Sequence, residues 1–175
     1  RGMACAASMA TAGSGATYGV TTEPADILAV VTEFGTILTA MVTPFDDRLA
    51  VDEQATIALM HHLIADGSDG VVLSGTTGEA STLTDDEKLR LFRLGVQEIG
   101  ATATVIAGTG SNDTAHSVHL TEQAAQIGVD AVLVVTPYYN RPPRAGIIGH
   151  VAAIAAVGVP VILYNIPSRS VVNMD

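Results

Sequence analysis

The sequence predicts an α/β protein, a TIM (β/α)8 barrel truncated to about the first five βα units, and two features of the chain support this fold class. From Phe34 onward, short β-branched runs alternate with longer stretches of helical periodicity. Each expected helix is followed by a glycine, and these glycines stand at Gly67, Gly100, Gly128 and Gly158, roughly thirty residues apart. A complete barrel has about 250 residues. A chain of 175 residues therefore holds only part of one.

The expected strands are nearly continuous apolar runs, which is typical of parallel strands that are buried on both faces. They cover residues 36–42, 70–74, 104–108, 131–136 and 161–165. Periodicity alone leaves a doubly wound open sheet as an alternative, because that fold has the same alternation of strands and helices. The residues that follow the strands favour the barrel.

The expected helices lie between these strands and have recognisable start signals. They cover residues 52–66, 85–99, 113–127 and 145–157. Thr84 and Glu87 have the spacing of a capping box, and Asp52 and Asn112 are the expected N-caps of their helices.

Residues 1–33 are expected to form a flexible N-terminal tail, and residues 34–175 the N-terminal part of the barrel catalytic domain. The tail is rich in Ala, Ser, Thr and Gly, and it lacks the charged and apolar blocks of a signal peptide. It holds the one cysteine, Cys5, which excludes an internal disulfide and a cysteine metal cluster. This cysteine usage fits a cytoplasmic protein.

The charge of the chain argues against nucleic acid and membrane partners. With 18 acidic residues against 8 Lys and Arg, the formal net charge is -10, which repels phosphate backbones and anionic lipid. The apolar stretch 145–166 contains His150 and is broken by Gly158 and Pro160. It therefore predicts a buried helix followed by a buried strand, not a membrane span.

In a barrel, the residues that follow the strands gather at one end of the fold, where the active sites of this architecture lie. Residues 75–79, 137–141 and 164–169 follow the second, fourth and fifth strands, and they hold three of the four tyrosines of the chain. Hydroxyl groups relay protons, and arginine binds carboxylates through paired hydrogen bonds. These loops predict a site for a substrate that carries a carboxylate.

The same loops also have a purely structural interpretation. Gly75 and Gly78 permit positive φ, so they are expected to shape the turn after the second strand. The glycine-rich loop after the third strand is a weak dinucleotide fingerprint, because Asp113 stands where a third glycine is required. His116 and His119 have no further ligands at metal spacing and are expected to be surface histidines. No metal and no cofactor is predicted.

Several strings of the chain, taken together, resemble the dihydrodipicolinate synthase family. They are TAMVTPF at 39–45, GTTGEAST at 75–82, IAGTGSN at 106–112, VVTPYYNRP at 134–142 and LYNIPSRS at 163–170. Their order and their places at strand ends carry the resemblance, which covers the chain from about Gly35 onward. Related pyruvate lyases share the GxTGE loop and the tyrosine after the fifth strand but usually lack YYNRP. N-acetylneuraminate lyase and keto-sugar-acid aldolases remain alternatives.

The resemblance implies a lyase that condenses pyruvate with aspartate semialdehyde in lysine and diaminopimelate biosynthesis. In this family pyruvate forms a Schiff base with a lysine, and Thr77 would bind its carboxylate. Thr76 would relay protons between Tyr164, the principal acid and base, and Tyr139, which serves the site of the neighbouring subunit. Arg169 would receive the carboxylate of aspartate semialdehyde. The resemblance also implies a homodimer or homotetramer.

The only lysine, Lys88, is expected on the surface of the helix after the second strand, where its ammonium would be solvated. The family's Schiff-base lysine follows a later strand, beyond Asp175. The resemblance therefore implies an incomplete site and no activity for this chain alone. A protein of another class, a non-catalytic half-barrel that self-associates through exposed strand edges, remains open.

Overall fold

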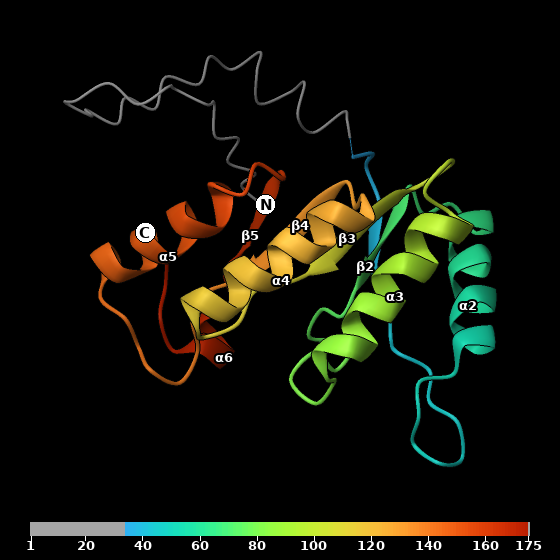
Figure 1. Ribbon diagram of the computed structural model, residues 1–175, viewed down its shortest axis with the longest axis horizontal. Helices are drawn as coiled ribbons and strands as arrows, with labels where there is room; N and C mark the ends of the chain where they lie inside the picture. The colour runs from blue at the N-terminus through green and yellow to red at the C-terminus, as the bar shows by residue number, and fades with distance from the viewer. Residues whose placement is uncertain (1–33, 175) are drawn as a thin grey trace.

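The computed structural model describes residues 34–174, so the expected N-terminal tail lies outside the described residues. The described chain alternates strands and helices (Figure 1). The strands are β1 (Leu38–Ala40), β2 (Gly70–Leu73), β3 (Thr104–Gly108), β4 (Ala131–Val135) and β5 (Val161–Tyr164). The helices are α2 (Glu53–Ala65), α3 (Asp85–Glu98), α4 (Thr114–Ile127), α5 (Arg144–Ala155) and α6 (Pro167–Ser170). The sequence predicted all of them except α6.

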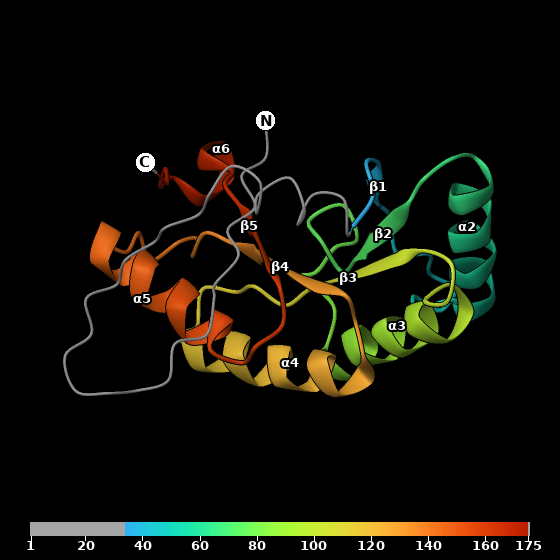
Figure 2. The same cartoon turned by 90° about the horizontal axis from the view of Figure 1, so that it is seen from above.

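The described strands form one parallel sheet in chain order, β1-β2-β3-β4-β5. Helices α2 to α5 lie along one side of this sheet (Figure 2). A doubly wound sheet reverses its strand order and carries helices on both faces. The sequential order and the one-sided helix layer are instead those of a (β/α)8 barrel, so the predicted fold class is confirmed.

Neighbouring side chains along a strand pack on opposite faces of the sheet. Val71 and Val105 belong to the main core between the sheet and the helices, where they meet Phe92 of α3, and all three are completely buried. Val72 and Ile106, one position further along, belong to a smaller cluster on the other face. The main core attaches the helices, and the smaller cluster faces the side that the interior of a barrel would occupy.

The helix starts agree with the predicted signals at two places and differ at a third. Thr84 and Glu87 form the predicted capping box at the start of α3, and the predicted cap of α2 is also present. The N-cap of α4 is Asp113, not Asn112, because the Asp113 carboxylate accepts the backbone N–H of His116 at 2.9 Å. An ionised carboxylate is a stronger acceptor for this purpose than an amide oxygen.

The apolar stretch 145–166 is a helix followed by a strand, as predicted, because it contains most of α5 and all of β5. The predicted burial of the strand is only partly correct, since β5 is at the edge of the described sheet and only its Val161 is buried. Within residues 34–174, no helix is long and apolar enough to cross a membrane.

The helices end in two different ways. Gly67, Gly128 and Gly158 follow α2, α4 and α5 and have left-handed φ values, which is typical of a glycine after a helix. Helix α3 ends at Glu98 with Ile99 as its C-cap, and Gly100 does not adopt the left-handed conformation.

Two aspartates accept hydrogen bonds from backbone N–H groups at the amino ends of the strands. Oδ2 of Asp69, just before β2, accepts the backbone N–H groups of Thr36 and Ile37 at 2.6 and 2.8 Å. Oδ2 of Asp130, just before β4, accepts the N–H of Val105 at 2.8 Å. Each carboxylate thus binds the backbone at the start of the preceding strand.

Candidate active site

One large pocket opens at the carboxyl ends of the strands, with a volume of about 710 Å³. It is lined by residues that follow β2, β3, β4 and β5. Active sites of barrel enzymes lie at this end of the sheet, where the loops can vary without disturbing the strands. This pocket is therefore the candidate active site.

The loop after β2 brings Thr76 to the pocket, whereas its neighbour Thr77 does not line it, and both side chains are exposed. Gly78 packs closely against the end of β1. A Cβ at Gly78 would lie 3.1 Å from the carbonyl oxygen of Met41, and the Gly78 carbonyl accepts the buried Thr43 hydroxyl at 2.7 Å. These contacts hold the loop in place.

The expectation that Gly75 and Gly78 supply positive φ in this loop is wrong. The left-handed residues are Ser74, with φ 51°, and Glu79, with φ 59°. The buried Ser74 hydroxyl, moreover, has no hydrogen-bond partner within the described chain. Gly78 is explained by the close backbone contact, and the loop holds backbone strain beside the pocket.

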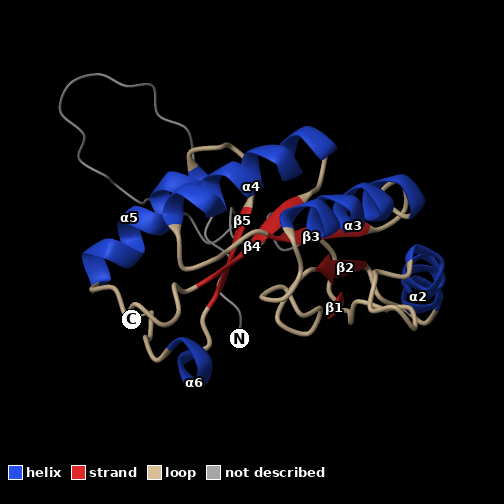
Figure 3. Cartoon of the chain, turned by 60° about the horizontal axis from the view of Figure 1, so that its bottom comes forward, coloured by secondary structure: helices blue, strands red, loops and turns tan. Residues whose placement is uncertain are grey.

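Tyr164, at the end of β5, and Arg169, in α6, line the same pocket as Thr76. Helix α6 lies close to the end of β5 and apart from the helix layer (Figure 3). It begins with Pro167, whose fixed φ suits the first helical position, and the buried Ser170 hydroxyl lies 3.1 Å from a backbone carbonyl of the same segment. This short helix places Arg169 at the pocket.

Tyr139 lies outside the pocket of its own chain. It is 91% exposed, whereas its neighbour Tyr138 lines the pocket. The Asn140 backbone N–H donates to the Tyr138 carbonyl at 2.9 Å, and Tyr139 between them has φ 73°. A γ-turn with positive φ is rare and strained.

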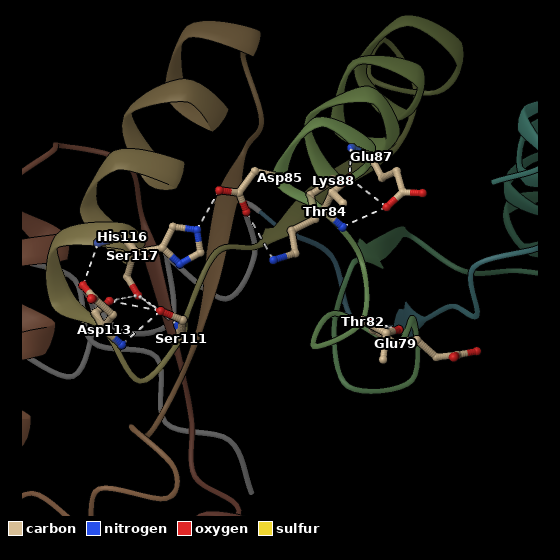
Figure 4. Close-up of polar contacts among 10 residues, drawn as sticks. All are labelled: Glu79, Thr82, Thr84, Asp85, Glu87, Lys88, Ser111, Asp113, His116 and Ser117. Carbon is tan, nitrogen blue, oxygen red and sulfur yellow. Dashed lines mark hydrogen bonds and ion pairs between the residues drawn. The ribbon is translucent and has the colours of Figure 1, made fainter. Parts of the chain in front are cut away.

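Lys88 is buried, so the expectation of a solvated helix-surface lysine is wrong. It is 9% exposed and lines the pocket. Its Nζ lies 3.5 Å from one carboxylate oxygen of Asp85, and the other oxygen lies 2.7 Å from Nε2 of His116 on α4 (Figure 4). The i, i+3 spacing of Asp85 and Lys88 was a usable signal for their contact. Nothing local in the sequence shows that α4 completes the cluster.

The charges of this cluster act on Asp85 and on the pocket. Burial disfavours the ionised Asp85, but the hydrogen bond and charge of His116 and the ammonium of Lys88 outweigh it and hold its pKa below 3.8. Besides His116, the charged side chains that line the pocket are two cations, Lys88 and Arg169, and one carboxylate, Asp85. In a chain of net charge -10, this local balance suits an anionic ligand.

The two histidines that were expected on the surface differ from each other. His119 is exposed, as predicted, and contacts Gln123. His116 is partly exposed and lines the pocket, where its Nε2 lies 2.7 Å from the Asp85 carboxylate. Within residues 34–174, no group of three or more His, Cys, Asp or Glu side chains is arranged to hold a metal ion.

The chain has parallel βα units in chain order and a pocket at the carboxyl ends of its strands, and these features place it in the class of (β/α)8-barrel proteins. The model of the dihydrodipicolinate synthetase family matches residues 33–175. The chain belongs to this family.

Individual proteins of similar sequence and structure support this family assignment. The 4-hydroxy-tetrahydrodipicolinate synthase of Heliobacterium modesticaldum is 54% identical over 143 residues, which are 81% of this chain and 48% of that protein. A crystal structure of dihydrodipicolinate synthase from Bacillus anthracis is 50% identical, with a TM-score of 0.79 over 80% of this chain and 48% of the other. DHDPS from Cyanidioschyzon merolae, crystallised with lysine bound, is 44% identical, with a TM-score of 0.79 over 81% and 49%. The chain spans about half the length of the relatives it matches.

Proposed function

We propose that the whole protein is a lyase that condenses pyruvate with L-aspartate 4-semialdehyde, as a 4-hydroxy-tetrahydrodipicolinate synthase of lysine and diaminopimelate biosynthesis. The observation that carries the proposal is the convergence of Thr76, Tyr164 and Arg169 on one pocket. Both substrates are carboxylates, and the two cations of this pocket, Lys88 and Arg169, outnumber its one carboxylate.

The chemistry needs a lysine amine, proton transfer and carboxylate binding. The amine attacks the keto carbon of pyruvate, water leaves, and the resulting imine acidifies the methyl group that then forms the new carbon bond. Tyr164 would move the protons, with Thr76 as a relay. Thr77 does not line the pocket of this chain, but it follows Thr76 directly and would hold the pyruvate carboxylate from there. Arg169 would hold the second carboxylate, because a guanidinium forms paired hydrogen bonds with it.

Lys88 is not the amine of this proposal. Its Nζ is engaged in an ion pair with the Asp85 carboxylate, 3.5 Å away, and it lies on helix α3 and not at the end of a strand. The proposal therefore assigns the imine-forming lysine to the half of the relatives' length that this chain does not span, and predicts no activity for this chain alone.

Tyr139 would act in a second subunit, so the proposed enzyme is a homodimer or homotetramer. Its 91% exposure supports this role, since an exposed tyrosine can enter the site of a neighbouring copy. A cytoplasmic location belongs to the same proposal, because a chain with one cysteine forms no internal disulfide.

A graft tests the proposal. Residues 34–175 are joined to the second half of the H. modesticaldum synthase. The graft and this chain are each treated with pyruvate and borohydride, and the mass of each protein is then measured by mass spectrometry. We expect a pyruvyl adduct on a lysine from the relative in the graft, and none on Lys88 in either protein. An adduct on Lys88 would contradict the proposal.

Variants of the graft test the individual roles. Tyr164→Phe should lower turnover about 10²- to 10⁴-fold with little change in the KM for pyruvate, because it removes the acid and base but no pyruvate contact. Arg169→Lys, the matched charge-conserving change, should instead raise the KM for aspartate semialdehyde. A graft that cleaves N-acetylneuraminate and does not condense aspartate semialdehyde would favour the related aldolases.

A further inference from the structure

Asn140 joins two loops at the carboxyl ends of the strands. It follows Tyr139 in the loop after β4, and its amide Nδ2 donates to the backbone carbonyl of Asn112 at 3.0 Å. Asn112 belongs to the loop between β3 and α4. Asn140 does not line the pocket, so any part it takes in the site passes through its neighbours.

The backbone on both sides of Asn140 is strained. Tyr139 has φ 73° and Arg141 has φ 45°, and neither residue has the conformational freedom of glycine. The γ-turn bond from the Asn140 N–H to the Tyr138 carbonyl closes around Tyr139 at 2.9 Å. Strained backbone persists only where the surrounding structure over-determines it. Some contact must therefore hold this turn.

The loop that receives the Asn140 side chain is itself firmly held. The Ser111 N–H donates to the Ser117 hydroxyl oxygen at 2.9 Å, and the same hydroxyl donates to the Asp113 carbonyl at 2.8 Å. Ser117 is completely buried, so its hydroxyl group is shielded from water, while Ser111 and Asp113 are more exposed. The carbonyl of Asn112, between Ser111 and Asp113, is thus a fixed acceptor for Asn140.

We propose that Asn140 is a positioning residue: its hydrogen bond to Asn112 holds the strained turn and so keeps Tyr139 outside the pocket of its own chain, where it can serve a second copy. The destination of Tyr139 rests on the proposed function. The hydrogen bond from Asn140 to Asn112, here called the clamp, does not rest on the proposed function, because it depends only on contacts within this chain. Loss of the clamp should let the Tyr139 backbone relax to negative φ.

The clamp is tested in this chain without substrate. Asn140→Ala and Asn140→Asp both remove the donor, and Asp keeps the size of the side chain. We expect the backbone N–H of residue 140 to exchange with solvent about fivefold to tenfold faster in both variants, because the γ-turn opens. In chains labelled with 3-fluorotyrosine, the Tyr139 fluorine signal should shift and that of Tyr164 should not. Unchanged exchange and an unchanged Tyr139 signal would overturn the proposal.

A rescue and a matched control separate clamping from general loosening. Tyr139→Gly combined with Asn140→Ala should restore slow exchange at residue 140, because glycine adopts positive φ without strain and needs no clamp. Asn165→Ala removes a comparable side-chain amide bond, to Asn173 at 2.8 Å, and should leave exchange at residue 140 unaltered. Failure of the rescue, or an equal effect of Asn165→Ala, would overturn the proposal. If the clamp behaves as expected but the graft is inactive, the result contradicts the proposed function and not the positioning role of Asn140.

Discussion

The two ends of the sheet use left-handed backbone differently. Before the strands, the described residues with positive φ are all glycine, namely Gly35, Gly67, Gly128 and Gly158. After the strands they are all residues other than glycine, namely Leu49, Ser74, Glu79, Tyr139, Arg141 and Val171. Glycine adopts this conformation without the steric penalty that a Cβ brings. The amino ends are therefore relaxed, and the carboxyl ends carry strain around the pocket.

The carboxylates of the two ends differ in the same sense. At the amino ends, Asp69 and Asp130 bind backbone N–H groups of the strands. At the carboxyl ends, Asp85 binds the side chains of Lys88 and His116, which line the pocket. The carboxylates at the amino ends stabilise the fold. The carboxyl ends contain strained backbone and hold charged side chains at the pocket.

The largest effect is expected for Gly108→Ala at the end of β3, where glycine is required by contact and not by φ. A Cβ at Gly108 would lie 2.0 Å from the carbonyl oxygen of Ser74. Relieving this clash moves β2 away from β3, so we expect a loss of about 3 kcal/mol in the free energy of unfolding, measured with urea. Gly149→Ala is the matched control, since a Cβ there meets nothing within 4 Å. A control that lost as much stability would show that the contact is not the cause.

A smaller loss is expected for Gly128→Ala at the amino ends. Gly128 has φ 94°, and a Cβ there would meet nothing within 4 Å. The whole effect is therefore the left-handed conformation itself, about 1 to 2 kcal/mol by urea denaturation. A loss below about 0.5 kcal/mol would break the comparison, because the amino ends would then not need glycine.

Asp69→Asn should change how stability depends on pH, with an effect at neutral pH smaller than that of either glycine change, because Asp69 is exposed. The backbone N–H groups of Ile37 and Thr36 hold the pKa of Asp69 below 3.8. A carboxyl group whose pKa is lower in the folded state stabilises the fold while ionised, and this contribution is lost as the pH falls through the folded pKa. The variant should therefore lose less stability than the parent on acidification below about pH 4. Parallel stability curves for the two proteins would refute this role.

The smallest effect, and one of opposite sign, is expected for Ser74→Gly at the carboxyl ends. Glycine would relieve the left-handed strain and remove a buried hydroxyl that has no partner in the described chain. The greater freedom of glycine in the unfolded chain opposes this gain. We expect a net stabilisation of about 0.5 kcal/mol in urea denaturation. A loss above about 1 kcal/mol would mean that the carboxyl ends are not strained at this residue.

The features that the sequence predicted well depend on neighbours in the chain. The capping box of Thr84 and Glu87 needs only residues three apart, and the strands were visible as apolar runs. Thr76, Tyr164 and Arg169 could be predicted to share a pocket because parallel strands place their carboxyl ends together. The order of residues along the chain was sufficient to predict the capping box, the strands and this shared pocket.

The features that the sequence did not predict depend on tertiary contacts. Lys88 is buried and pairs with Asp85, whose other carboxylate oxygen contacts His116 on the next helix. The left-handed conformation falls on Ser74 and not on Gly75, although glycine is the residue that local rules favour. A local rule identifies the residue that adopts a conformation most easily, while packing around a site decides which residue adopts it.

The chain-order sheet also has a consequence for how the protein is made. Each of the strands β2 to β5 pairs with the strand that precedes it, about thirty residues earlier in the chain. The loops that must close are therefore short, and each of β2 to β5 finds the strand before it already made. Each βα unit can dock on the unit before it as it leaves the ribosome, so folding can keep pace with synthesis.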